Sequence, residues 1–132
     1  MDGYIINNAY STEETLTSKT WIDGKKIYQK TFTHSWGSSG SSSGGVTDID
    51  ITNLQIDSIV NGEGVILGSN SSYGKGYYPM TFMNATSSGT ANAYKWGINE
   101  TKTTLTFQMQ GDGLSFKMYD CTFTLEYTKT SQ

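Results

Sequence analysis

The sequence predicts an all-β protein, an antiparallel and jelly-roll-like β-sandwich that begins with a β-hairpin. Apolar and polar residues alternate along several short runs, most clearly at Leu105, Phe107 and Met109. This period of two is typical of strands that bury one face. No segment keeps the 3.6-residue period of an amphipathic helix. Glycine-containing turn sequences separate the runs, a pattern that favours a sandwich over other β architectures.

The N-terminal residues 1–18 are polar and mixed, so we expect them to precede a sandwich domain that spans residues 19–132. Ser11 and Glu14 have the spacing of a helix capping box, but the residues after them support one helical turn at most. The next segment predicts the hairpin, because Asp23-Gly24 separates two runs rich in strand-forming residues. Asp-Gly is typical of a two-residue type I′ turn, in which both central residues have positive φ.

Serine and glycine make up most of residues 35–45, which predicts a flexible loop because ordering such a segment costs backbone entropy. Further runs with strand character follow it, and turn sequences at residues 61–64 and 110–113 separate some of them. The predicted strands after the loop are residues 48–56, 64–67, 77–83, 91–98, 103–110, 114–119 and 121–129.

The composition excludes several classes of function. Nine Lys and Arg against 12 Asp and Glu give a net charge of -3, which offers no electrostatic reason to bind nucleic acid. With one Cys and one His, the chain lacks the residues for a Cys-based zinc site, a two-imidazole site or a disulfide framework, so we expect no metal and no other cofactor. We also expect no signal peptide and no membrane insertion, because no apolar run reaches about 20 residues.

The surface is expected to be uncharged and rich in hydroxyl groups. Charged residues make up 16% of the chain, against about a quarter in typical domains. The chain has 16 Ser and 19 Thr, and only 35% of its residues are hydrophobic. This apolar fraction is low, so association between copies of the chain is expected to supply additional burial.

Aromatic residues beside glycines are the best candidates for a binding site. Tyr73, Lys75 and Tyr77 lie in a glycine-flanked segment, where the rings would offer flat faces to sugars and the hydroxyls would form hydrogen bonds. Trp36 is a further candidate from the Ser/Gly loop. The alternative for each ring is packing in the core or between subunits. Cys121 is expected to be a small buried hydrophobic residue.

No catalytic group is predicted, so we expect a protein that is not an enzyme. His34 precedes Ser35, but both lie next to a flexible segment, whereas nucleophilic catalysis needs an oriented base. We expect a solvated loop histidine. Asp48 and Asp50 share one face of a predicted strand, which favours a solvated face over a hard-cation site or a glycosidase pair.

Several segments resemble the small C-terminal β-domains of fibre and minor structural proteins of tailed bacteriophages. The resemblance lies in residues 10–14, in the Trp-Ile-Asp-Gly-Lys sequence of residues 21–25 followed by residues 27–30, in Tyr78-Pro79-Met80, and in the C-terminal residues 125–130. Together these segments bracket the chain from about residue 10 to residue 130.

The resemblance implies a virion protein, usually a homotrimer, at a fibre tip or on the virion surface, in contact with the host envelope and with other virion proteins. The expected function is therefore the binding of a host cell-surface receptor, a glycan, without cleavage. The alternative is a structural element for trimerisation or decoration that contacts no receptor. A depolymerase is disfavoured because the acidic residues of the chain are few and not grouped.

Overall fold

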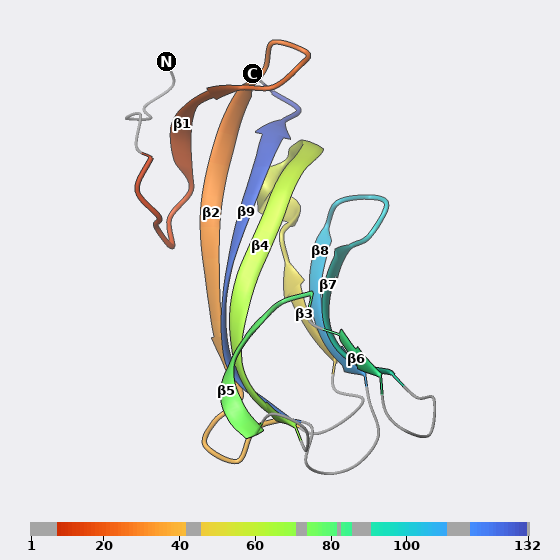
Figure 1. The fold of residues 1–132 in the computed structure, drawn as a ribbon. Helices are drawn as coiled ribbons and strands as arrows, with labels where there is room; N and C mark the ends of the chain where they lie inside the picture. The colour runs from red at the N-terminus through yellow and green to blue at the C-terminus, as the bar shows by residue number, and fades with distance from the viewer. Residues whose placement is uncertain are drawn as a thin grey trace.

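The computed structural model describes residues 8–41, 46–70, 74–81, 83–85, 91–110 and 117–131. Two antiparallel sheets pack face to face in this part of the chain, which confirms the predicted all-β sandwich (Figure 1). The only helical segment among the described residues is a short 3-10 turn, η1 (Thr52–Leu54).

The larger sheet has five strands in the order β1-β2-β9-β4-β5, and the smaller sheet has four in the order β3-β8-β7-β6. The chain alternates between the sheets from β2 to β3 to β4, and again from β8 to β9, as in a jelly roll. In contrast, β4 and β5 are consecutive strands of one sheet, and so are β6, β7 and β8. The strands are β1 (Thr15–Thr20), β2 (Lys26–Ser35), β3 (Val46–Asp50), β4 (Ile56–Asn70), β5 (Gly74–Pro79), β6 (Met83–Ala85), β7 (Ala91–Ile98), β8 (Thr104–Gln110) and β9 (Lys117–Lys129).

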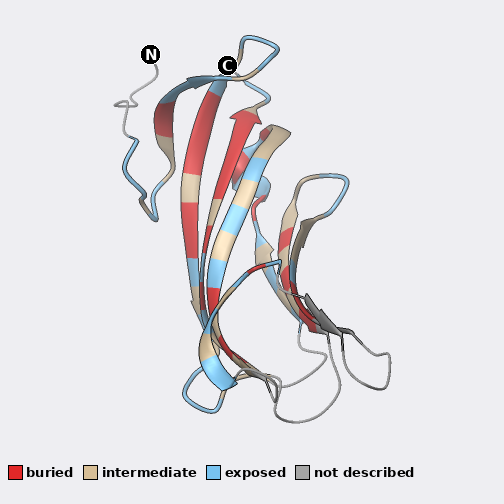
Figure 2. Cartoon of the chain, viewed as in Figure 1, coloured by how far each residue is buried: buried red, intermediate tan, exposed pale blue. Residues whose placement is uncertain are grey.

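The core lies between the two sheets and contains the alternating apolar residues that the sequence predicted. Strand β9 buries one face along its length, from Cys121 to Tyr127, and β8 buries Leu105, Phe107 and Met109 opposite it (Figure 2). The Phe123 ring centroid lies 5.5 Å from that of Phe107, so aromatic contacts connect the sheets directly.

The predicted turn at residues 61–64 is wrong, because these residues lie inside the long strand β4. Their glycines allow close approach of aromatic rings. A Cβ atom at Gly62 would lie 2.7 Å from the rings of Trp96 and Phe123, and one at Gly68 would lie 2.2 Å from the Tyr94 hydroxyl. The glycines of β4 therefore serve packing between the sheets rather than a change of chain direction.

Strands β1 and β2 form the predicted hairpin, but not with the predicted turn. Gly24 has a φ of 89°, whereas Asp23 is not among the described residues with positive φ. The Gly24 N–H donates to the Trp21 carbonyl at 2.9 Å, and the Trp21 N–H donates to the Lys25 carbonyl at 2.8 Å. These bonds close a three-residue loop with glycine at its left-handed position, so the two-residue type I′ turn is wrong.

Strand structure begins at Thr15, four residues before the boundary that the sequence predicted at residue 19. No helical turn forms in residues 8–14; instead the Glu13 N–H donates to Ser11 Oγ at 3.1 Å. The Glu14 carboxylate accepts hydrogen bonds from Tyr127 Oη at 2.5 Å and from Lys129 Nζ at 2.7 Å. Residues 8–14 are thereby attached to the sandwich.

The Ser/Gly segment is also attached to the sandwich where the structure describes it. Ser35 belongs to β2, and the Trp36 N–H donates to the Tyr119 carbonyl at 2.7 Å. Ser41 and Met118 exchange two backbone hydrogen bonds of 2.7 and 3.0 Å. Residues 36–41 therefore run beside β9, while residues 42–45 lie outside the described residues.

Other strand boundaries differ from the predicted ones. In two places a local turn divides a predicted strand, and in one place two predicted strands form a single strand with a bulge. The predicted strand 48–56 divides into β3, η1 and the start of β4, with Gln55 left-handed at a φ of 52°. The predicted strand 77–83 divides between β5 and β6. Residues 117–129 form one strand, in which a register shift near Tyr119 replaces the predicted break. Residues 91–98 form a strand as predicted.

The glycine contacts in β4 lead to a stability prediction. We expect Gly68→Ala to destabilise the protein by about 1–3 kcal/mol, because the added methyl group overlaps the buried Tyr94 side chain and the Lys117 carbonyl. Gly76 is its register partner on β5, and a Cβ there would meet nothing within 4 Å, so Gly76→Ala is the control. Urea unfolding of both variants measures the difference. Equal stabilities would contradict this account of Gly68.

Candidate functional site

The outer face of the larger sheet, which points away from the smaller sheet, carries rows of threonines. Thr31 and Thr33 of β2 lie opposite Thr124 and Thr122 of β9, and the Oγ atoms of Thr31 and Thr124 are 2.9 Å apart. The alternate residues, such as Phe123, point into the core. Cross-strand threonine pairs stabilise the sheet. Thr33 and Thr122 are exposed on this face, whereas Thr31 is buried.

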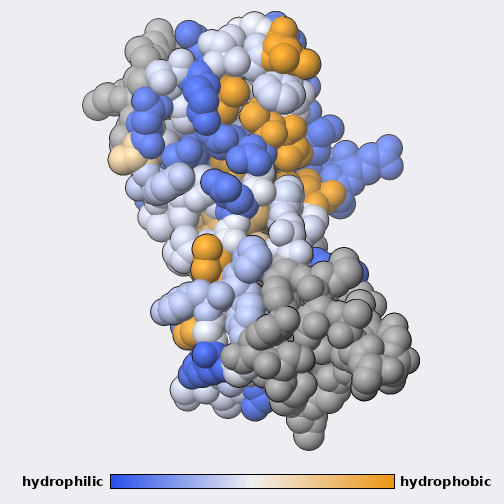
Figure 3. Space-filling view, viewed as in Figure 1, coloured by the Kyte–Doolittle hydropathy of each residue, from blue (hydrophilic) through white to orange (hydrophobic). Residues whose placement is uncertain are grey.

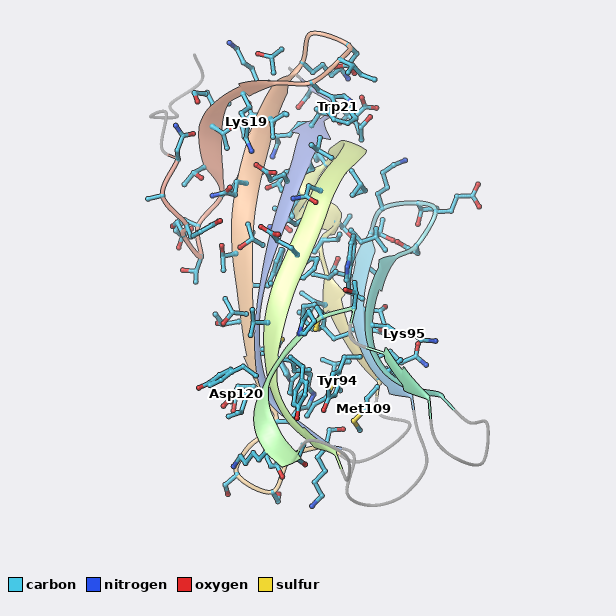
Figure 4. All side chains as sticks on the ribbon, viewed as in Figure 1. Lys19, Trp21, Tyr94, Lys95, Met109 and Asp120 are labelled. Carbon is cyan, nitrogen blue, oxygen red and sulfur yellow. The ribbon has the colours of Figure 1, made fainter. Side chains whose placement is uncertain are left out.

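Strands β4 and β5 extend this face with apolar side chains and a tyrosine. Val65 lies opposite Thr122, and Leu67 lies between Asp120 and Tyr77 in register. The Tyr77 side chain is 77% exposed and Val65 is 50% exposed. Figure 4 shows Asp120 on the outer side of the sheet, whereas Tyr94 lies between the two sheets.

Two adjoining depressions cross this face and form what we call the outer groove. The first has a volume of about 260 Å³ and the second about 280 Å³, and both are lined by Val65 and Thr122. Because they share these residues, the depressions lie side by side on this face. The residues that line only the first are Leu67, Tyr77, Asp120 and Cys121. The side chains that line only the second are Tyr10, Thr31, Glu63 and Thr124.

The second end of the outer groove depends on Tyr10, which is 70% exposed. Tyr10 precedes the first strand, and backbone contacts place it: the Thr31 N–H donates to the Ser11 carbonyl at 2.8 Å. Lys30 Nζ also donates to the Thr12 carbonyl at 2.9 Å. Sequence reasoning missed Tyr10 as a site residue, because its segment has no strand pattern. The Thr-Phe-Thr sequences of β2 and β9 could have predicted a sheet face that carries hydroxyl groups, because alternate residues of a strand share a face.

Two of the predicted site residues lie together beside this groove. Lys75 and Tyr77 are both exposed and have one residue between them on β5, so they share its outer face at a spacing of about 7 Å. Lys75 Nζ lies 4.3 Å from the centroid of the Tyr119 ring, in a cation–π contact. Tyr73 lies outside the described residues.

Trp36 is separated from these residues. Its half-buried ring packs against the core, and its indole N–H donates to Thr47 Oγ1 at 2.8 Å. The His34 ring lies 4.8 Å away in an edge-on contact. His34 is half-buried within β2, so the predicted solvated loop histidine is wrong; the strand extends further than the composition of residues 35–45 indicated.

Asp48 and Asp50 are exposed on one face of β3, as predicted. Asp48 accepts a hydrogen bond from Thr106 Oγ1 at 2.8 Å. Asp50 accepts from the hydroxyl and the backbone N–H of Thr52, and these two bonds lower the pKa of its carboxyl. Within the described part of the chain, no three His, Cys, Asp or Glu side chains group in a way that could hold a metal ion.

Cys121 is buried on the inner face of β9, with 4% of its surface exposed, as predicted. Desolvation raises the pKa of its thiol to about 12, and the nearby Asp120 charge acts in the same direction. A backbone hydrogen bond to His34 lowers it by a smaller amount. The thiol is therefore protonated and shielded at neutral pH.

No protein-family model, curated protein or solved structure matches this chain. Within the described segments, no helix is long and apolar enough to cross a membrane. The geometry of the outer groove, with aromatic rings at both ends and hydroxyls and carboxylates between them, is therefore the main basis for a functional assignment.

The environment of Cys121 predicts slow thiol chemistry. At pH 8 we expect a disulfide reagent such as Ellman's reagent to react with the native protein on the order of a hundredfold more slowly than with the urea-unfolded chain, because thiolate formation is suppressed only in the fold. A Cys121→Ala, Ser35→Cys variant, whose thiol would be exposed, is the control and should react rapidly when native. Rapid reaction of native Cys121 would contradict its burial.

Proposed function

We propose that the chain is a carbohydrate-binding β-sandwich that holds a glycan in the outer groove without cleaving it. The observation that carries this proposal is a pair of adjoining depressions with an exposed tyrosine in each, Tyr77 in the first and Tyr10 in the second. Sugar rings present apolar C–H faces that pack on aromatic rings, and their hydroxyl groups pair with side-chain oxygens.

The groups between the tyrosines suit this chemistry. Thr122 and Thr124 offer hydroxyls that both donate and accept, and Asp120 and Glu63 offer carboxylate acceptors. Val65 supplies an apolar surface at the point shared by the two depressions. A shallow, open groove with these groups fits part of a polymer better than a small molecule that needs enclosure.

Binding without cleavage agrees with the placement of the two carboxylates. Glycosidases hold their carboxyl groups about 5–9.5 Å apart across the scissile bond. Glu63 lies opposite Thr124, and Asp120 lies opposite Leu67, so the two positions are four residues apart along β4. Four residues of strand correspond to about 13 Å between the backbone positions, which favours two separate contacts over a catalytic pair.

The resemblance to phage fibre domains supplies the proposed setting. In that setting the chain is a virion component, the glycan belongs to the host cell surface, and the domain assembles as a homotrimer. Apolar residues reach the surface in separate patches (Figure 3). Ile22 is 90% exposed and Val46 is 56% exposed, and both lie outside the outer groove. These residues also support the alternative, a trimerisation or decoration element without a receptor.

The glycan-binding proposal is tested by replacing Tyr77. We expect Tyr77→Ala to weaken binding to immobilised host-cell polysaccharide about tenfold or more, since loss of an aromatic contact of about 1.4 kcal/mol is a factor of ten. The melting temperature should not change, because the ring is exposed. Lys26→Ala truncates an exposed side chain of β2 that does not line the groove, and this control should bind normally. Parent-like binding by Tyr77→Ala would contradict the proposal.

The proposed assembly has a separate test. We expect light scattering to give the mass of a trimer at micromolar concentration, and Ile22→Ser with Val46→Ser to reduce that mass if these residues pack between copies. A monomer that still binds polysaccharide would contradict the proposed trimer but not the proposed glycan site. A trimer that binds no polysaccharide would favour the structural alternative.

A further inference from the structure

The outer groove carries negative charge that no lysine of the described residues neutralises by an ion pair. Glu63 and Asp120 line its two halves and are exposed, and neither forms an ion pair with any described residue. Other carboxylates of the larger sheet are paired: Glu126 bonds to Lys19, and Asp57 bonds to Lys25 at 2.7 Å.

The cation on the same face does not change this balance within the groove. Lys75 is two register rows beyond Tyr77, opposite Ser69, and is not among the residues that line either depression. Its ammonium group lies over the Tyr119 ring. An anionic ligand in the outer groove would therefore meet two carboxylates and no lining cation, on a chain whose net charge is -3.

We infer that the ligand is a linear glycan without carboxylate, phosphate or sulfate groups, which lies obliquely across four strands from Tyr77 to Tyr10. This inference rests on the proposed function and specifies its ligand. Carboxylates accept hydrogen bonds from sugar hydroxyls or amino groups but repel anionic substituents within a Debye length of about 10 Å.

The path of the groove sets a minimum length for this ligand. From β5 to β2 the sheet spans three strand spacings, or about 14 Å. The groove also advances four residues along β4, from the position of Leu67 to that of Glu63, which is about 13 Å. The diagonal is about 20 Å, longer than one sugar ring. Only an oligosaccharide can contact both tyrosines at once.

Contacts at both ends of one ligand make affinity depend on chain length. Once a sugar is stacked on Tyr77, the binding of a linked sugar at Tyr10 becomes intramolecular, and its effective concentration is high. A short oligosaccharide gains only one of the two contacts. We therefore expect a hexasaccharide to bind at least tenfold more tightly than the disaccharide of the same series.

Polysaccharides that differ mainly in charge test the first part of the inference. Galactan is compared with polygalacturonate, and mannan with alginate, by interferometry on the intact protein at 20 mM and 500 mM NaCl. We expect at least one neutral polymer to bind and its acidic counterpart to bind at least tenfold more weakly at low salt, with a smaller difference at high salt because the repulsion is screened. Tighter binding of the acidic polymers would overturn the inference and leave the glycan site in place.

Matched variants assign the selectivity to the groove. Glu63→Gln with Asp120→Asn should reduce the difference between neutral and acidic polymers. The control Asp23→Asn with Glu100→Gln changes the net charge equally at exposed positions that do not line the groove, and it should leave the difference unchanged. Equal effects of both pairs would overturn the role of Glu63 and Asp120.

Oligosaccharides of two and six residues, prepared from the neutral polymer that binds, test the second part. Tyr10→Ala should lower the affinity for the hexasaccharide to that for the disaccharide and leave the disaccharide affinity unchanged. Equal affinities for both lengths in the parent protein would overturn the extended path but not the proposed function. Failure of every neutral polymer to bind would overturn both.

Discussion

Side-chain alternation along β9 determines both the core and the outer groove. This strand pairs with β2 on one side and with β4 on the other, so its register fixes three strands at once. Phe123 and Leu125 point into the core, while Thr122 and Thr124, which alternate with them along the strand, line the groove. A shift of register by one residue would exchange the two sets, burying hydroxyls and exposing aromatic rings. Burial of the apolar residues of β9 therefore fixes the register that places its threonines in the groove.

Close packing between the sheets depends on glycine as much as on the aromatic residues. Gly62 and Gly68 lie on the inner face of β4, where a side chain would overlap the Trp96 or Tyr94 ring of the opposite sheet. A side chain at Gly64 would overlap the neighbouring strand β9 of the same sheet. The Tyr94 ring occupies part of this space, and its hydroxyl group donates a hydrogen bond to the Lys117 carbonyl at 3.0 Å. Burial raises the pKa of that hydroxyl, which keeps it a hydrogen-bond donor at any physiological pH.

Features encoded by local alternation could be predicted from the sequence, and features created by distant contacts could not. The alternation at Leu105, Phe107 and Met109 gave the fold class, and the glycine-flanked segment correctly indicated Lys75 and Tyr77 as exposed. In contrast, the role of Gly62 depends on Trp96 and Phe123, which are far away in sequence. The two glycines of residues 61–64 therefore predicted a turn, because the neighbouring sequence does not indicate that a ring packs against them.

Backbone hydrogen bonds explain the remaining errors, since they do not depend on side-chain composition. Ser41 pairs with Met118 although its neighbours are serine and glycine. Tyr10 reaches the outer groove through the bond between Thr31 and Ser11, in a segment whose polar sequence suggested a tail. Strand β2 continues past the end of its pairing with β1, and the segment of Tyr10 binds to this uncovered edge. The sequence gives no local sign of that edge.

The two ends of the outer groove are consequently held in different ways. Tyr77 belongs to a strand that is paired with β4 over six residues, from Gly74 to Pro79. Tyr10 belongs to no strand. Its segment is attached by a backbone bond at Ser11, by hydrogen bonds that involve side chains, such as that of Lys30 to the Thr12 carbonyl, and by the Glu14 contacts described above. Segments with few buried contacts open at lower free energy than central strands. The Tyr77 end is therefore the preformed part of the site, and a ligand that reaches Tyr10 also stabilises the attachment of the N-terminal segment to the sandwich.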